Sequence, residues 1–261
     1  MPGRTGRILT LTDVEDVLVA GDLHGNLAGF QELIQLADLG NHPRRHFVVQ
    51  ELIHGPHRYS DESDKSHQLV DVLAALKCQY PRQVHYLLGN HEVAQGSGRT
   101  IGKGDDTCNV QFRKGVTTAY GENSEDIYVA YLQFFTAAPL AIRTPNRVWL
   151  SHSLPPPSRL PTWSLAVLQQ NIPDPADVVP GGTIYHLVWG RDASEESVRE
   201  FLRKVDADWL ITGHLPTDDG FAAPNKYQVV LDCQQSPGGY CLFPADRPVT
   251  HQEVLACVKT I

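Results

Sequence analysis

The stretch of sequence that decides the fold is Asp16-Val17-Leu18-Val19-Ala20-Gly21-Asp22-Leu23-His24-Gly25-Asn26. Its first five residues form a compact apolar run, which predicts a buried β-strand. A carboxylate and an imidazole, Asp22 and His24, follow this strand directly, where they have little structural purpose. Asn26 can cap a helix over residues 27–37, whose apolar positions recur at helical spacing, and Gly40 predicts its end. The stretch therefore predicts a strand, a polar tip and a helix in succession.

Short apolar runs alternate with amphipathic stretches in the rest of the chain, a pattern typical of βαβ units and a layered α/β fold. The predicted strands are 46–50, 84–88, 140–142, 148–150, 209–212, 229–231 and 240–243, and the predicted helices are 66–79, 125–137 and 195–205. The segment from Val93 to Asn123 is polar and glycine-rich, so we expect a loop that is either a lid or mobile. No repeat or composition break marks a second domain. We therefore expect an N-terminal segment, residues 1–15, and a single domain, residues 16–261.

Composition and charge exclude several classes of protein. The net charge of -8 argues against a nucleic-acid partner. No apolar run reaches the ~20 residues that a membrane span requires. The first ten residues lack the features of a signal peptide, so secretion is not expected. The five cysteines are scattered and form neither a disulfide framework nor a CxxC zinc site, so we expect a reducing, cytoplasmic location.

Five separate predicted strands end in side chains that can bind metal. These side chains are Asp22 and His24, then Glu51 and His54, then Asn90, His91 and Glu92, then His152, and finally His214. The carboxyl ends of parallel strands share one edge of an open α/β sheet, so the fold would bring these residues together. Carboxylate, imidazole and amide ligands without cysteine favour Mn, Fe, Zn or Mg. Two such ions about 3.5–4 Å apart activate a phosphoryl group and a water molecule for in-line attack.

Four short motifs follow one another in the chain: Gly21–Asn26, Gly89–Glu92, Val148–Leu154 and Ile211–His214. In this order they resemble the motifs of the phosphoprotein phosphatases within the calcineurin-like metallophosphoesterase superfamily. Gly21–Asn26 is similar to their GDxHG motif and Gly89–Glu92 to their GNHE motif. Val148–Leu154 resembles their apolar strand ending in histidine, and Ile211–His214 resembles their final GH motif. The linkers before the second and third of these are also similar, and the resemblance covers roughly residues 16–240.

The resemblance implies a four-layer αββα sandwich with a dinuclear metal site at one edge. Carried over by position, the metal ligands would be Asp22, His24, Glu51, Asn90, His152 and His214. His91 would be the general acid that protonates the leaving alkoxide or stabilises its charge. The two ions would be Mn, Fe or Zn, with Mn favoured. The implied reaction is hydrolysis of a phosphomonoester by a metal-bound hydroxide, and a Ser/Thr phosphoprotein is the favoured substrate over a small phosphoester.

The second motif departs from the family pattern. The family has GDxxDRG where this chain has Gln50–Pro56. Glu51 therefore stands in place of the bridging aspartate, and its oxygens lie further out by about one C–C bond. His54 stands where an aspartate would orient His91. Two imidazoles cannot form a carboxylate–imidazolium pair, so we expect His91 to hold its proton less firmly.

Gly55 replaces the arginine with which the family binds phosphate. The candidates to supply that cation are Arg58, Arg99 and Arg191. Arg191 is our first choice, because an arginine fork can bind phosphate oxygens bidentately. Tyr59, Asp61 and the loop over residues 94–123 could shape access of the substrate.

Two other functions are compatible with the sequence. The short chain and the replaced arginine leave open a hydrolase of dinucleoside polyphosphates or phosphodiesters. The altered second motif leaves open an inactive scaffold that binds metal or phosphate. Retention of every ligand position in some form, together with His91, favours an enzyme.

Overall fold

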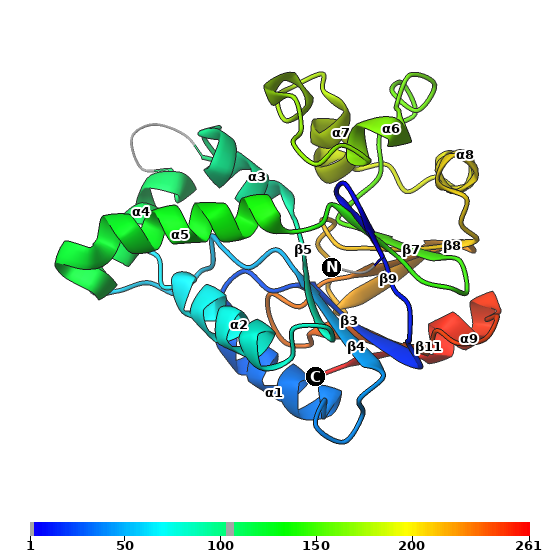
Figure 1. The fold of residues 1–261 in the computed structure, drawn as a ribbon, viewed down its shortest axis with the longest axis horizontal. Coiled ribbons are helices and arrows are strands. Elements are labelled where there is room, and N and C mark those ends of the chain that lie inside the picture. Colours follow the sequence, from blue (N-terminus) through cyan, green and yellow to red (C-terminus); the bar gives the residue numbers. More distant parts are fainter. Residues whose placement is uncertain (1–2, 103–106) are drawn as a thin grey trace.

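The structure, a computed structural model, describes residues 3–102 and 107–261 and contains two β-sheets (Figure 1). The larger sheet has the strand order β1 (Arg4–Thr5), β2 (Ile8–Thr10), β6 (Ala141–Arg143), β7 (Val148–Ser151), β8 (Trp209–Thr212), β10 (Gln228–Leu231) and β9 (Phe221–Asn225). The smaller sheet has the order β12 (Val258–Thr260), β11 (Gly239–Pro244), β3 (Asp16–Asp22), β4 (Arg45–Gln50) and β5 (Val84–Leu87). Strands β3, β4 and β5 are parallel, so their carboxyl ends share one edge.

The helices lie outside the two sheets and at the ends of the strands (Figure 1). They are α1 (Leu27–Ala37), α2 (His67–Gln79), α3 (Asn90–Ser97), α4 (Cys108–Tyr120), α5 (Ser124–Ala137), α6 (Leu165–Leu168), α7 (Thr183–Trp189), α8 (Glu195–Val205) and α9 (His251–Ala256), with 3-10 turns at Gly121–Asn123 and Pro175–Asp177. Across the described ranges, no helix combines the length and apolar character needed to cross a membrane.

Strand β3 shows how the sequence produces the layers. Val17 and Val19 face an apolar core that both sheets share, whereas Leu18 belongs to a second cluster that contains Phe30 of α1. A strand buried on both faces reads as a continuous apolar run, which is why residues 16–20 lack alternation. On the far side, Phe201 of α8 covers the larger sheet. The predicted four-layer αββα sandwich is therefore confirmed.

The polar segment from Val93 to Asn123 differs from the predicted loop. Most of its described part is helical, in α3 and α4, while residues 103–106 lie outside the described part. The Thr107 side chain caps α4 by accepting the N–H of Val110, and Phe112 is fully buried. Because only Phe112, Gly115 and Val116 of this helix are buried, its apolar stripe is too thin to recognise in the sequence.

The predicted helix over residues 27–37 is confirmed as α1, but the residue that ends it is Asp38, in the left-handed conformation with φ 42°, rather than Gly40. Strands β1 and β2 lie within the predicted N-terminal segment, and β2 pairs with β6 through Ile8 and Ala141. This pairing joins the segment to the larger sheet, and the division at residue 15 stays a prediction.

A buried histidine pair between the sheets makes stability depend on pH. Nδ1 of His46 lies 2.8 Å from Nε2 of His85. Burial lowers the pKa of both rings, and that of His85 lies well below its ordinary 6.5, with Lys77 adding to the effect. The unfolded chain takes up protons below pH 6.5 while the folded chain does not, so the free energy of unfolding falls as pH falls, by up to about 1.4 kcal/mol per pH unit and group.

Replacing His85 with glutamine should flatten this acid dependence. Glutamine keeps a polar partner for His46 but cannot take up a proton in the unfolded chain. We expect the slope of unfolding free energy against pH to decrease by up to about 1.4 kcal/mol per pH unit between pH 6.5 and 5. Urea unfolding of both proteins at several pH values measures the slopes, and equal slopes would contradict the buried neutral state of His85.

Candidate metal centre

The structure brings the predicted site residues together at the carboxyl ends of the strands. A pocket of about 270 Å³ opens there, and its lining consists of Asp22, His24, His54, Asn90, His91, Arg191, His214, Pro216, Asp232 and Gln234. Glu51 and His152 are fully buried. All six predicted metal ligands therefore lie in or directly behind one pocket, although β3, β4, β5, β7 and β8 deliver them from distant parts of the sequence.

The carboxylate of Asp22 and two imidazoles form one side of the site. Asp22 accepts the backbone N–H of His214 at 2.8 Å. Nε2 of His152 lies 3.2 Å from Nδ1 of His214 and 2.8 Å from the amide oxygen of Asn90. A Cβ at Gly213 would lie 2.0 Å from the Asp22 carboxylate, so only glycine leaves room for that oxygen.

Glu51 connects the two sides of the site. One carboxylate oxygen lies 2.7 Å from Nε2 of His152. The two oxygens accept the N–H groups of Asn90 at 3.1 Å and His91 at 2.8 Å, the first residues of α3. The positive end of the helix dipole also favours a carboxylate there. The longer side chain fits because Gly89 has no Cβ, which would lie 2.1 Å from the carboxylate.

The backbone at the site is strained. His24, Glu51, His54 and His214 all have positive φ values, of 40°, 47°, 64° and 69°. Residues with a Cβ avoid this left-handed region, at a cost of roughly 1–2 kcal/mol each. The tips of β3, β4 and β8 therefore turn sharply at the residues that carry the site's side chains.

The donor set fits divalent metal ions. Within residues 3–102 and 107–261, Oδ1 of Asp22 and Nε2 of His214 are buried without a hydrogen-bond partner. Burial lowers the pKa of His152 to about 3 and of His214 to about 2, so both rings are neutral. Burial, and then the nearby Glu51, raise the pKa of Asp22. Neutral imidazoles and carboxylates in need of a cation are the state that metal binding requires.

Two groups of potential ligand atoms share one residue. His24, Glu51 and His91 offer atoms within 4.8 Å of one another, and so do Asp22, Glu51 and His152. The shared Glu51 is consistent with the predicted bridging ligand. His91 stands in the first group, although we predicted a proton donor at this position.

His54 contacts His91 directly. Their Nδ1 atoms lie 2.8 Å apart, and Nε2 of His54 lies 2.9 Å from the side-chain oxygen of Gln95. The Gln95 amide nitrogen donates to Tyr128 and to the Asn109 carbonyl, which fixes the amide orientation. His54 must therefore donate from Nε2 and, when neutral, accept at Nδ1. The proton of neutral His91 then lies on Nδ1, and its Nε2 carries a lone pair.

The pKa values agree with neutral rings. Burial lowers the pKa of His54 to about 4. The pKa of His91 lies well below its ordinary value, first because of burial and then because of His24 and His54. The expected direction is therefore found, but burial rather than His54 is its main cause.

Sequence reasoning missed the supporting role of two residues, Gln50 and Glu92, although it counted Glu92 among the side chains that can bind metal. The Gln50 side-chain oxygen lies 3.1 Å from Nδ1 of His152 and orients that ring. Glu92 accepts the N–H groups of Leu52 and Ile53, at 2.7 and 3.2 Å, and so holds the tip of β4. Burial, and then Glu51, raise its pKa to about 8. Gln50 directly precedes Glu51, and Glu92 lies two residues after Asn90. This proximity to predicted ligands is the sequence signal that could have indicated their supporting role.

The three candidate arginines lie in different environments. Arg191 is exposed and lines the site pocket. Arg58 lies 3.7 Å from the buried carboxylate of Asp64, and Arg99 lies over the rings of Tyr185 and Trp189. Neither of the last two lines the pocket.

Two residues expected to shape substrate access point elsewhere. The Tyr59 hydroxyl lies 2.9 Å from Nε2 of His67. Asp61 accepts hydrogen bonds from Ser63 and Thr118. Neither Tyr59 nor Asp61 lines the site pocket, so the expectation for them is not supported.

A sandwich of two sheets with carboxylate and imidazole ligands at the strand ends is the arrangement of metal-dependent phosphoesterases. The family model described as calcineurin-like phosphoesterase matches residues 16–218. The chain therefore belongs to the calcineurin-like phosphoesterase family.

Relatives in this family include protein phosphatases. A probable serine/threonine-protein phosphatase of Encephalitozoon cuniculi is 23% identical over 247 residues, which are 87% of this chain and 50% of that protein. The chain thus spans about half the length of this curated relative. This relative supports the resemblance to the phosphoprotein-phosphatase branch.

Solved structures share the fold. A serine/threonine phosphatase of Saccharomyces cerevisiae has a TM-score of 0.64 at 17% identity, covering 91% of this chain and 76% of that one. A cold-active protein-tyrosine phosphatase of a psychrophilic Shewanella species has a TM-score of 0.65 at 12% identity, covering 97% and 82%. A putative diadenosine tetraphosphatase has a TM-score of 0.54 at 16% identity, covering 98% and 97%.

Proposed function

We propose that this protein hydrolyses phosphomonoesters with two divalent metal ions, and that phosphoserine or phosphothreonine in proteins is its favoured substrate. The observation that carries the proposal is that the six predicted ligand side chains meet at one pocket, with Glu51 in both groups of candidate ligand atoms. In the described parts of the chain, Asp22 and His214 each offer a buried atom that has no hydrogen-bond partner. The phosphatase relatives support the substrate class. Oxygen and imidazole-nitrogen donors suit Mn, Fe or Zn, and Mn remains our favoured metal.

Each side chain would have a separate task. Asp22, His24 and Glu51 would hold one ion, and Asn90, His152 and His214 would hold the other with Glu51 between them. Ions bound there polarise a phosphoryl group and lower the pKa of a water molecule. Arg191 would bind the phosphate oxygens, since it is the arginine of the described residues that lines the pocket.

His91 would supply the proton to the leaving oxygen, with His54 as its positioning residue. Neutral His91 keeps its proton on Nδ1, toward His54, so donation from Nε2 requires the doubly protonated ring. Burial beside His54 lowers the pKa of His91 and so opposes the doubly protonated ring. Leaving groups that depart without a proton, such as aryl oxides, should therefore react faster than alkyl ones.

Changing His54 to aspartate tests this arrangement. A carboxylate beside Nδ1 favours the imidazolium form of His91 and raises its pKa, since an opposite charge at this distance changes a pKa by about 1–3 units. We expect the rate on an alkyl phosphate to rise about 10-fold relative to the rate on an aryl phosphate at pH 7. An unchanged ratio of the two rates, measured with both metals bound, would contradict a proton-donating role for His91.

Arg191 carries a separate prediction. Replacing it with methionine removes a charge-assisted bond to phosphate, so we expect KM to rise about 10- to 100-fold. Arg58→Met is the matched control, because Arg58 faces Asp64 rather than the pocket. Steady-state kinetics on 4-nitrophenyl phosphate give both values. A larger effect from Arg58 would transfer the phosphate-binding role to that residue.

A second function, hydrolysis of dinucleoside polyphosphates, has one observation in its favour. The putative diadenosine tetraphosphatase matches this chain over nearly the full length of both proteins. Assays of the purified protein on a phosphopeptide, a dinucleoside polyphosphate and a bis-aryl phosphate separate the two functions. Activity on the last two substrates alone would replace our proposal, and less than one divalent ion per chain after mild purification would favour an inactive scaffold.

We also propose a reducing, cytoplasmic location. Cys233 and Cys241 are buried and form no disulfide in the structure. Free buried thiols are typical of reducing compartments.

A further inference from the structure

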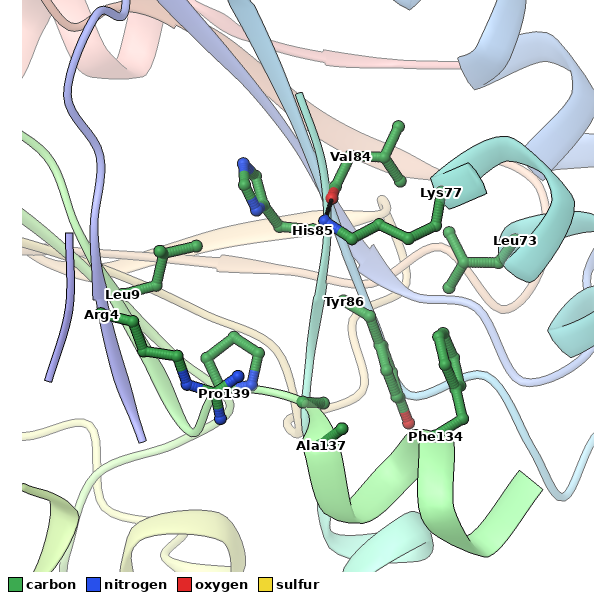
Figure 2. Close-up of a pocket in the computed structure, with 11 residues that line it drawn as sticks. Arg4, Leu9, Leu73, Lys77, Val84, His85, Tyr86, Phe134, Ala137 and Pro139 are labelled. Atoms are coloured by element: carbon green, nitrogen blue, oxygen red, sulfur yellow. Dashed lines mark hydrogen bonds between the residues drawn. The ribbon is translucent and has the colours of Figure 1, made fainter. Parts of the chain in front are cut away.

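A second cavity, of about 280 Å³, lies beside β5 and shares no lining residue with the pocket of the metal centre (Figure 2). Its wall is largely apolar and includes Leu9, Leu73, Val84, Tyr86, Phe134 and Pro139. The rings of Tyr86 and Phe134 stack, with centroids 5.5 Å apart and planes 6° apart. They form a flat apolar wall of the kind that aromatic or branched aliphatic groups pack against.

Two cationic side chains, Arg4 and Lys77, line the same cavity (Figure 2). Lys77 donates to the carbonyls of Pro81 and Val84 at 2.7 and 2.6 Å, and Arg4 donates to the Gly6 carbonyl at 2.8 Å. In the part of the chain that the structure describes, no ion pair joins either cation to a carboxylate. Their charges are therefore met only by carbonyl dipoles.

A third cation strengthens the positive field at this place. Arg7 donates to the carbonyls of Thr136 and Ala138, beside the cavity wall, and it too has no ion pair with a described carboxylate. Arg4 contributes to the lowered pKa of Arg7, which shows that the two guanidinium groups are close. Arg4 and Arg7, which have no ion pair with a described carboxylate, thus lie near each other in a protein whose net charge is -8, and Lys77 lines the cavity as well. An anion is the ligand that this arrangement lacks.

Lys77 also lacks an ion pair with a described carboxylate that would stabilise its positive charge. Burial lowers the pKa of its ammonium group to about 8. A bound anion would offset this desolvation, because an opposite charge within a few ångströms favours the charged form. The unmet charge and the apolar wall together call for a ligand with both an apolar body and an anionic group.

The edge of β5 favours a small molecule over a peptide strand. β5 is the last strand of its sheet, so its outer edge could in principle pair with an added strand. However, Val84 already donates to Tyr80 and accepts from Lys77, and Leu88 donates to Pro139. Little of the edge is left for a backbone to pair with.

We propose that this cavity binds a small amphipathic anion, an aromatic or branched aliphatic carboxylate or sulfonate. Its apolar body would pack against Tyr86 and Phe134, and the positive charges of Arg4 and Lys77 in the cavity wall would attract its anionic group. This site is independent of the function proposed for the metal centre.

Fluorescence titration of the metal-loaded protein tests the proposal. The probe is anilinonaphthalene sulfonate, which combines aromatic rings with one anionic group, and N-phenylnaphthylamine is its uncharged counterpart. We expect saturable binding of the sulfonate at one site. Lys77→Met and Arg4→Met should each weaken sulfonate binding about 10-fold, because each removes a positive charge from the cavity wall. Both variants should leave binding of the uncharged probe unchanged, whereas Phe134→Ala should weaken both probes.

Two control variants test whether a loss of sulfonate binding is specific to the cavity beside β5. Lys204→Met removes another half-buried lysine, whose ammonium group faces a carbonyl, that of Pro161. Arg191→Met removes a cation from the metal-site pocket. Neither should change sulfonate affinity, and thermal unfolding confirms that each variant is folded. If Lys77→Met does not fold, Arg4→Met decides the question. Binding without saturation, sulfonate affinity unchanged in the folded charge variants, or a loss caused by Arg191→Met would overturn the proposal.

Discussion

Replacement of Glu51 by glutamine is expected to reduce the metal content from two ions to one or none and to lower the phosphatase rate about 10³-fold or more. The carboxylate stands in both groups of candidate ligand atoms, so its loss affects both ions. The glutamine amide is neutral and has one oxygen. The N–H groups of Asn90 and His91 each donate to a different carboxylate oxygen of Glu51, so one of them would lose its acceptor. Metal ions supply several kcal/mol of transition-state stabilisation, and each 1.36 kcal/mol is a factor of ten in rate.

Glu92→Gln is the matched control for this experiment. Glu92 is also a buried carboxyl group beside the site, but its pKa of about 8 leaves it mostly protonated at pH 7. Glutamine keeps the oxygen that accepts the N–H groups of Leu52 and Ile53. Elemental analysis of both purified variants should find two ions in Glu92→Gln alone. Two ions retained in Glu51→Gln would show that Glu51 is not a ligand.

His91→Asn should lower kcat on an alkyl phosphate about 10²- to 10⁴-fold while both ions stay bound. This is the range for loss of a positioned general acid. The loss on 4-nitrophenyl phosphate should be smaller, because its leaving group needs no proton. His186→Asn, which changes a half-buried histidine of α7 that does not line the pocket, should leave both rates near those of the natural protein.

Metal analysis separates two roles for His91. Its ring lies with His24 and Glu51 among atoms that could hold an ion. A ligand role predicts that His91→Asn loses one of the two ions and that both substrates slow equally. Retention of both ions with a difference between the substrates supports the proton donor.

The sequence predicted the central strands well, because burial on both faces leaves a plain signal. Residues 16–20, 46–50 and 84–88 are apolar runs that end in glycine or polar residues, and each proved to be a parallel strand of the smaller sheet. The short strands β1, β2, β9 and β12 were missed. Their pairing depends on residues more than a hundred positions away or on a few exposed backbone groups, and neither leaves a local pattern.

The site residues could be gathered from the sequence, but their contacts could not. Asp22, Asn90 and His214 each follow a predicted strand, and these positions predicted that the three side chains would lie close together. The bonds from Asn90 and His91 to Glu51 depend on how the chain turns at the tip of β4, and the pattern of side chains does not encode that turn. The alignment of His54 with His91 was expected from a motif position, whereas the Gln95 amide that fixes the tautomer lies a full turn further along α3 and carries no motif.

The left-handed backbone at His24, Glu51, His54 and His214 bears on how this chain can evolve. A descendant released from selection for the reaction would gain folding stability by accepting glycine or asparagine at any of these four places. Drift there should therefore be rapid and directional. A paralogue with glycine or asparagine at all four places would therefore be expected to have lost the proposed reaction.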